Sequence, residues 1–311
     1  SFGGERVNPY YTTLICFIMA SLAFVALELT SMSISVLRTF QKGDFYQDPF
    51  PHLIIRDALP NAVCDQLIKE YPSLDTLGVD ATQNNMRWNF SASRVKNSEG
   101  ISDLWKELIE YHSSPEFFAE LIEIFGESLI DLYPGRFENL QQLKELAVGV
   151  RGVDSFSDKD VLLDAQIAGN TPATSTRSVR STHVDSMHAM FAGLFYLRQE
   201  DDDSVGGDLE IRRFRPELSD AQKLGCFRRA IYVDDKWTEL VKTVKYDRNV
   251  LVVLVNGVDS LHGVSPRQPT PHRRLFMNLV ADMDQPLFHI PSLRKSLRRF
   301  GRRIMQRVKG A

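Results

Sequence analysis

The chain has 311 residues, of which 43% are hydrophobic and 25% are charged; these ordinary globular values exclude a fully disordered, collagen-like or multi-span membrane protein. Three scattered cysteines are too few for a disulfide framework or a cysteine-based zinc site, so we expect a reducing compartment, the cytoplasm. The net charge of −3 divides into +8 for residues 292–311, which hold eight Lys or Arg and no acidic residue, and −11 for the rest of the chain.

Residues 1–42 form an apolar N-terminal segment. No charged residue lies between Val7 and Leu27, and residues 14–27 are strongly apolar. A membrane span needs about 20 apolar residues, so this segment could form a single N-terminal membrane anchor. A second interpretation starts from the observation that the sequence begins with Ser: the native start would be Met32, and residues 1–31 would be an upstream extension.

Residues 43–160 show mostly helical periodicity. Apolar side chains recur at helical spacing between Pro60 and Pro72, and again over residues 104–109. Ser114 before a proline has the form of a helix start, and we expect this helix to run to Gly126. The region is therefore predicted to be a mainly helical lead-in that packs directly on the part that follows.

Residues 161–285 consist of short β-rich runs separated by polar turns. Seven such runs cover residues 162–168, 189–197, 206–214, 229–233, 238–246, 249–255 and 274–281. This spacing, with no crossover helices between the runs, is typical of a β-sandwich or barrel. An α+β protein with a β-barrel core is the predicted class.

Two histidines and one aspartate in this region form a candidate metal site. His183 and Asp185 are two residues apart, so on a strand or its end their side chains point the same way. His262 follows soon after the apolar run 249–255 and can enter the mouth of the same barrel. Two histidines and one carboxylate are the ligand set of non-haem Fe(II) oxygenases, and they leave three of six octahedral positions open for a bidentate 2-oxo acid and O₂.

A pair of arginines opens the last predicted strand. A cosubstrate with a distal carboxylate needs a fixed cation, which a guanidinium group supplies in a matching planar geometry. Only one of Arg273 and Arg274 can face inward, since neighbours on a strand point to opposite faces. We favour Arg274 because it shares its face of the strand with Asn278. The alternation of side chains is less regular near the end of a strand, so Arg273 stays an alternative.

The order of these motifs resembles that of the Fe(II)- and 2-oxoglutarate-dependent dioxygenases, and most of all the bacterial prolyl 4-hydroxylase-like branch. The shared pattern is His183-x-Asp185, a strand ending in Tyr196 and Leu, a Gly-Gly turn, an Asn-containing strand, His262 with Val and Pro, and then a basic residue. The resemblance covers residues 162–282, and more loosely 48–72. The gap of eleven or twelve residues from the second histidine to the arginine is slightly longer than usual in the family.

The resemblance implies a double-stranded β-helix, a jelly-roll barrel, with the helical region packed on it. It also implies that His183, Asp185 and His262 bind Fe(II), that Arg274 or Arg273 binds the far carboxylate of 2-oxoglutarate, and that Tyr196 hydrogen-bonds the same cosubstrate. The implied activity is hydroxylation or another oxidation with release of succinate and CO₂, using O₂ and with ascorbate as a reductant. The substrate, whether a small molecule, a glycan, a lipid or a protein side chain, is not predicted.

Two other function classes remain open. A cupin-like metal barrel could carry out non-redox chemistry without 2-oxoglutarate. An inactive barrel, with the triad as a structural cluster, could act as a membrane-associated binding module. The basic tail, residues 286–311, has an apolar stripe at helical spacing and could lie on an anionic membrane or pack on the body. Nucleic-acid binding is not expected because no aromatic stacking platform accompanies the charge.

Several other polar residues are not expected to be ligands. His188 and His272 are interpreted as residues outside the metal site, and the run 201–203 of aspartates as a solvated loop. Residues 169–181 could be a substrate lid or an ordinary connection. Arg87 and its neighbour Trp88 could line the barrel mouth, but the sequence does not place them there.

Overall fold

The computed structural model describes residues 34–228 and 231–291. The predicted N-terminal segment, residues 1–42, lies outside this part up to residue 33, and the predicted basic tail, residues 286–311, lies outside it from residue 292 onward. Among the described residues, no helix combines the length and the apolar character that a membrane span requires.

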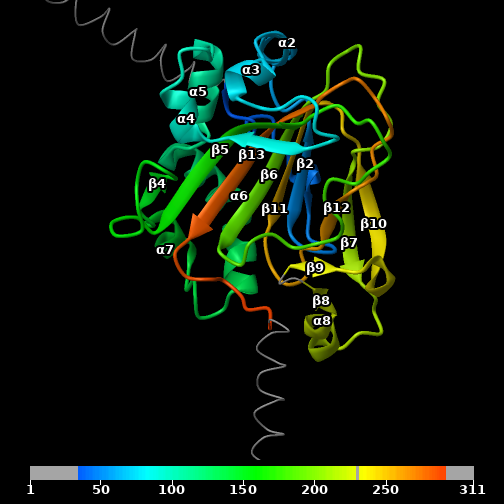
Figure 1. Cartoon of the computed structure of the whole chain (residues 1–311). Helices are drawn as coiled ribbons and strands as arrows, with labels where there is room; N and C mark the ends of the chain where they lie inside the picture. The colour runs from blue at the N-terminus through cyan, green and yellow to red at the C-terminus, as the bar shows by residue number, and fades with distance from the viewer. Residues whose placement is uncertain (1–33, 229–230, 292–311) are drawn as a thin grey trace, which may run out of the picture.

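Thirteen strands and seven α-helices make up the described part of the chain (Figure 1). The strands are β1 (Phe45–Tyr46), β2 (His52–Arg56), β3 (Arg87–Phe90), β4 (Val148–Val150), β5 (Val161–Asn170), β6 (Ala189–Leu197), β7 (Leu209–Phe214), β8 (Phe227–Arg228), β9 (Tyr232–Val233), β10 (Thr238–Val244), β11 (Arg248–Val255), β12 (His262–Val264) and β13 (Arg274–Met283). The helices are α2 (Asn61–Lys69), α3 (Leu74–Leu77), α4 (Ala92–Lys96), α5 (Asp103–Tyr111), α6 (Pro115–Leu132), α7 (Leu140–Lys144) and α8 (Asp220–Cys226), with 3₁₀ turns at η1 (Lys42–Asp44) and η2 (Asp235–Trp237).

Two sheets form the centre of the molecule. The larger has the order β1-β2-β11-β6-β13-β5-β3, with β4 beside β5, and the smaller has the order β10-β7-β12. A further antiparallel bridge joins His183 to His262, so the segment before β6 extends the smaller sheet beyond β12. The chain therefore alternates between the two sheets in the manner of a double-stranded β-helix. The predicted fold class, an α+β protein with a jelly-roll core, is confirmed.

The larger sheet is buried on both faces, which explains the uninterrupted apolar run in β11. Val250, Val252 and Leu254 belong to the apolar cluster inside the barrel, whereas the alternate side chains Leu251 and Val253 belong to the cluster between the sheet and the helices. A strand that is covered on both sides reads as a continuous hydrophobic run rather than an alternating one. Helix α5 contacts β5 and α6 contacts β11 on the outer face (Figure 1).

The predicted helices correspond to α2, α5 and α6, and one predicted boundary was wrong. Ser114 caps α6 by accepting the backbone N–H of Phe117, as its sequence predicts. The helix does not end at Gly126 but continues to Leu132. The glycine is a packing position instead, because a Cβ there would overlap the side chain of Leu140 on α7.

The lead-in region also supplies strands to the larger sheet. Strand β2 pairs antiparallel with β11, and β3 pairs antiparallel with β5, so both extend the barrel wall. Arg87 on β3 lies opposite Asn170 of β5, and Arg274 on β13 lies opposite the same asparagine from the other side. The predicted run 229–233 ends in β9, while residues 229 and 230 lie outside the described residues.

Candidate metal centre

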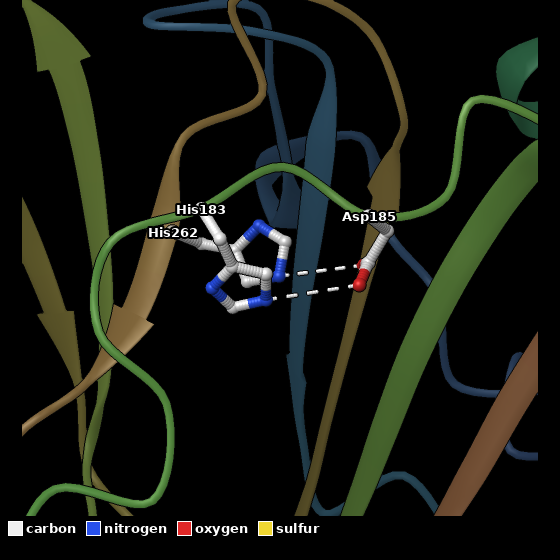
Figure 2. A group of neighbouring side chains, drawn as sticks. All are labelled: His183, Asp185 and His262. Carbon is white, nitrogen blue, oxygen red and sulfur yellow. Dashed lines mark ion pairs between the residues drawn. The ribbon is translucent and has the colours of Figure 1, made fainter. Parts of the chain in front are cut away.

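The structure brings His183, Asp185 and His262 together at one mouth of the barrel (Figure 2). The backbone N–H groups of the two histidines donate to each other's carbonyl at 2.8 and 2.9 Å, which sets their rings side by side with centroids 4.3 Å apart. Asp185 Oδ1 lies 3.7 Å from His183 Nε2, and its Oδ2 lies 3.3 Å from His262 Nε2. Two atoms bound to one ion at about 2.1 Å and at a right angle are about 3 Å apart, so this spacing suits a shared metal ion.

Both histidine rings are held in the tautomer that a metal requires. Nδ1 of His183 donates to the carbonyl of Ser181 at 2.8 Å, and Nδ1 of His262 donates to the carbonyl of Ser260 at 2.9 Å. With the proton held on Nδ1, Nε2 is the nitrogen that can bind a metal, and Nε2 of His183 is buried with no hydrogen-bond partner among the described residues. Such backbone contacts are the usual means by which proteins orient metal-binding histidines. The residues present fit a divalent metal ion.

The protonation states suit the same role. Burial and, to a smaller extent, the neighbouring His262 ring lower the pKa of His183 to about 4, so this ring is neutral at physiological pH. Burial alone would raise the pKa of the Asp185 carboxyl, but the two histidines beside it hold that pKa well below its ordinary range. The cluster thus presents a neutral imidazole at His183 and a carboxylate at Asp185, which are the forms that bind a metal.

Asn256, directly after β11, connects the segments that carry the three ligands. Its Nδ2 donates to the carbonyls of Ser186 and Ala189 at 2.7 and 3.0 Å, and its Oδ1 accepts the N–H of Asp185 at 3.3 Å. The same Oδ1 accepts the Ser260 hydroxyl at 3.1 Å. One buried amide therefore fixes both the aspartate segment and the residue whose carbonyl orients His262.

Arg180 is the second residue that touches the cluster without being a candidate ligand. Its Nη1 donates to Asp185 Oδ1 at 3.0 Å, which leaves Oδ2 facing His262. The segment that carries it is held to β12 and the loop that follows, since the Val264 N–H donates to the Arg180 carbonyl at 2.9 Å, and Ala173 pairs with Thr270 and Arg177 with Arg267 through backbone hydrogen bonds. These contacts favour the interpretation of residues 169–181 as a fixed connection rather than a lid.

A cavity of about 420 Å³ opens beside the cluster, within the usual range for small-ligand pockets. Its two walls differ in chemistry. One wall, from β3, β5 and β13 with Arg151, is polar and includes Arg87, Asn89, Gln166, Asn278 and Asp282. The other wall is apolar. It is formed by β6, β7, β11 and β12 and includes Leu194, Leu209, Val252, Leu254 and Val264. A bound molecule would meet hydrogen-bonding groups on one side and hydrocarbon on the other.

The predicted cosubstrate residues lie deeper in the barrel. Arg274 faces inward and is 2% exposed; its Nη2 donates to the Tyr196 hydroxyl at 3.0 Å, and its Nε is buried with no partner. Among the described residues no carboxylate lies within 4 Å of it. Arg273 points elsewhere: its Nη1 donates to the carbonyl of Pro72, and its guanidinium lies over the Tyr71 ring. Of the two arginines, only Arg274 points into the barrel.

The other histidines have structural contacts. His188 Nδ1 donates to the carbonyl of Met283 at 3.1 Å, and His272 Nε2 lies 3.5 Å from Asp203 on the surface. His112 is buried, donates from Nδ1 to the carbonyl of Leu108 and accepts the N–H of Val36 at Nε2. None of the three joins the His183 cluster.

Three site residues could not be assigned from sequence alone. Asn256 follows the apolar run of β11 directly, which is the one signal that could have identified it. Arg180 gave no signal beyond its position five residues before Asp185. Arg87 was considered as a residue of the barrel mouth, but its position could not be predicted, because only the pairing of β3 with β5 brings it to the cavity.

Comparison with known proteins gives only distant similarities. No family model and no curated protein matches the sequence. A prolyl-4-hydroxylase from Pseudomonas putida is 14% identical over 75% of this chain and 92% of its own, with a TM-score of 0.37. The Fe(II)/α-ketoglutarate-dependent dioxygenase TqaL is 12% identical over 91% of this chain and 100% of its own, with a TM-score of 0.40. The epimerase SnoN, solved with Fe³⁺, α-ketoglutarate and nogalamycin RO, is 13% identical over 75% of this chain and 78% of its own, with a TM-score of 0.37. Similarities at this level identify no activity for this chain.

Proposed function

We propose that the chain is an Fe(II)- and 2-oxoglutarate-dependent oxygenase. The observation that carries the proposal is the cluster of His183, Asp185 and His262, with Nε2 of both rings free and facing one carboxylate, beside a cavity. Iron bound there would supply oxidative decarboxylation: R–H, 2-oxoglutarate and O₂ become R–OH, succinate and CO₂, which balances atoms and electrons.

The chain's own residues have separable roles in this proposal. His183, Asp185 and His262 hold the metal, and Arg180 orients the carboxylate. Arg274 binds the distal carboxylate of 2-oxoglutarate, because a buried guanidinium without a carboxylate partner is costly unless an anion joins it. The Tyr196 hydroxyl accepts a hydrogen bond from Arg274 and so holds the guanidinium group in a fixed orientation.

Finer assignments rest on the order of the sequence motifs alone. The prolyl 4-hydroxylase-like branch, hydroxylation as the particular oxidation and ascorbate as a reductant stay predictions. No contact among the described residues favours the cupin-like alternative, which would need neither Arg274 nor 2-oxoglutarate.

Calorimetric titration of the Mn(II)-loaded full chain tests the proposal. We expect 2-oxoglutarate to bind at least about tenfold more tightly than 2-oxopentanoate, which has the same chain length but no distal carboxylate. Arg274→Met should abolish this preference, whereas Arg273→Met should keep it. Equal affinity for the two oxo acids in the unaltered protein would remove the cosubstrate from the proposal and favour the cupin-like alternative.

A further inference from the structure

Arg87 is a cation in the cavity wall that has no acidic partner among the residues that the structure describes. Its Nη2 donates to Asn278 Oδ1 at 2.8 Å, its Nε lies 3.4 Å from Asn89 Oδ1, and its guanidinium carbon is 5.3 Å from the centroid of the Phe276 ring. These contacts hold the side chain in place but provide no compensating charge.

The other two arginines of the cavity wall are each neutralised by acids. Arg151 forms ion pairs with Asp282 and, at 3.8 Å, with Asp164, while Arg180 pairs with Asp185 at 3.0 Å. Among the described residues, Arg87 alone of the three has no carboxylate within 4 Å. The cavity wall therefore contains one uncompensated guanidinium.

Arg87 remains charged in this position. Burial and, to a smaller extent, the nearby Arg180 lower its pKa to about 10, which leaves the guanidinium protonated at neutral pH. Arg87 is half-buried, and a partly desolvated charge that meets amide oxygens and an aromatic ring is incompletely compensated, so an anion in the cavity would offset the cost of desolvation.

The proposed cosubstrate does not supply the missing charge. The charge of a divalent metal and that of the 2-oxoglutarate dianion cancel each other. The surrounding side chains then contribute four positive charges, from the arginines at positions 87, 151, 180 and 274, and three negative charges, from the aspartates at positions 164, 185 and 282. One net positive charge is left. Arg87 also lines the cavity, whereas Arg274 does not; instead, the guanidinium carbon of Arg274 lies 4.9 and 5.0 Å from the ring centroids of Tyr196 and Phe276.

We infer that the molecule oxidised by this enzyme is an anion, a carboxylate or a phosphate ester, whose oxyanion binds Arg87 on the polar wall. The inference rests on the proposed function, because it assumes that the second anion site in the barrel, at Arg274, belongs to 2-oxoglutarate. The hydrocarbon part of the substrate would then lie along the apolar wall of Leu194, Val252 and Leu254. A planar guanidinium fork suits both kinds of oxyanion, so the structure defines their shared chemistry.

The test uses the full chain loaded with Mn(II) and saturating 2-oxoglutarate, titrated with three probes in a calorimeter. Benzoate is a planar carboxylate, sulfate is a tetrahedral oxyanion, and benzamide is the uncharged counterpart of benzoate. We expect at least one of the two anions to bind about tenfold or more tightly than benzamide, since a charge-assisted contact is lost with the amide. The anion that binds better indicates whether the natural group is a carboxylate or a phosphate.

Two variants decide whether Arg87 is responsible. Arg87→Met should abolish the preference for the anion and leave the affinity for 2-oxoglutarate within about twofold, and Arg87→Lys should retain part of the preference. The control is Arg213→Met, which removes a surface arginine paired with Asp48 and Glu239 and should change neither affinity.

Several results would overturn the inference. They are equal binding of both anions and benzamide, an anion preference that survives in Arg87→Met, and a loss of 2-oxoglutarate affinity in Arg87→Met as large as that in Arg274→Met. The last would assign Arg87 to the cosubstrate. Failure of the proposed function is separate: it would appear as an absence of 2-oxoglutarate binding in the unaltered protein, and the three probes would then be compared without the oxo acid.

Discussion

Replacement of Asn256 by alanine should weaken metal binding although Asn256 is not a ligand. The side chain makes four hydrogen bonds: two to the carbonyls of Ser186 and Ala189, one from the Asp185 N–H and one from the Ser260 hydroxyl. At about 1 kcal/mol each, their loss should lower the free energy of unfolding by about 4 kcal/mol. Because residues that orient metal ligands typically contribute 10–100-fold, we expect the dissociation constant for Mn(II) to rise by about that factor.

Asn249→Ala is the matched control for this prediction. Asn249, near the start of β11, is also a buried asparagine, and its amide exchanges hydrogen bonds with the backbone N–H and carbonyl of Leu59, far along the chain from the candidate ligands. Its φ of 60° adds backbone strain for alanine, so the expected loss of stability is similar, about 3 kcal/mol. Metal affinity should not change.

The free energy of unfolding is measured on the metal-free proteins by urea unfolding followed by circular dichroism. The dissociation constant for Mn(II) is measured by calorimetric titration of samples shown to be folded. An Asn256→Ala protein that is destabilised but binds Mn(II) within twofold of the unaltered chain would refute the positioning role. An equal loss of affinity in Asn249→Ala would show that the effect is general destabilisation.

Three further predictions concern the scaffold. Gly169→Ala should destabilise the protein by about 1–3 kcal/mol in urea unfolding, because its Cβ would lie 2.6 Å from the Arg274 carbonyl oxygen and 2.8 Å from the Trp88 ring; an unchanged midpoint would contradict this. Burial lowers the pKa of His112 to about 4 from 6.5, so the unfolded chain binds the proton more readily and this residue should lower stability by about 2 kcal/mol between pH 7 and pH 5; the pKa of His183 is lowered similarly, so His112→Gln should remove about 2 kcal/mol of the total fall and leave the His183 part. Burial raises the pKa of the Cys64 thiol to about 11, so peptide mapping after treatment with a thiol reagent at pH 8 should find Cys64 modified in urea and unmodified in the native protein.

Most of the β core was predictable because its strands have strong local patterns. The run that forms β11 is apolar on both faces and β6 is nearly so, while β13 is apolar on one face and mixed on the other, which sets all three apart from the polar turns around them. The short β12 has only three residues, and the segment carrying His183 joins the smaller sheet through isolated bridges. Pairings of this kind are set by tertiary contacts and leave no periodic pattern in the sequence.

The three candidate ligands could be named from the sequence, whereas the residues that contact and orient them could not. The spacing of His183, Asp185 and His262 follows from how residues alternate along strands, and parity correctly favoured Arg274 as the inward arginine. Arg87 comes from a strand about a hundred residues before the metal motif and reaches the cavity only because β3 pairs with the far edge of the sheet. No local rule predicts such a contact.

The most direct measurement is anaerobic addition of Fe(II) and then 2-oxoglutarate to the full chain, monitored by visible absorption. A bidentate 2-oxo acid on iron held by His183, Asp185 and His262 should produce a metal-to-ligand charge-transfer band. The band should be absent in His183→Ala, which removes the Nε2 lone pair that is buried without a partner. Iron that binds without any band after 2-oxoglutarate, or a band that persists in His183→Ala, would contradict the account of this site.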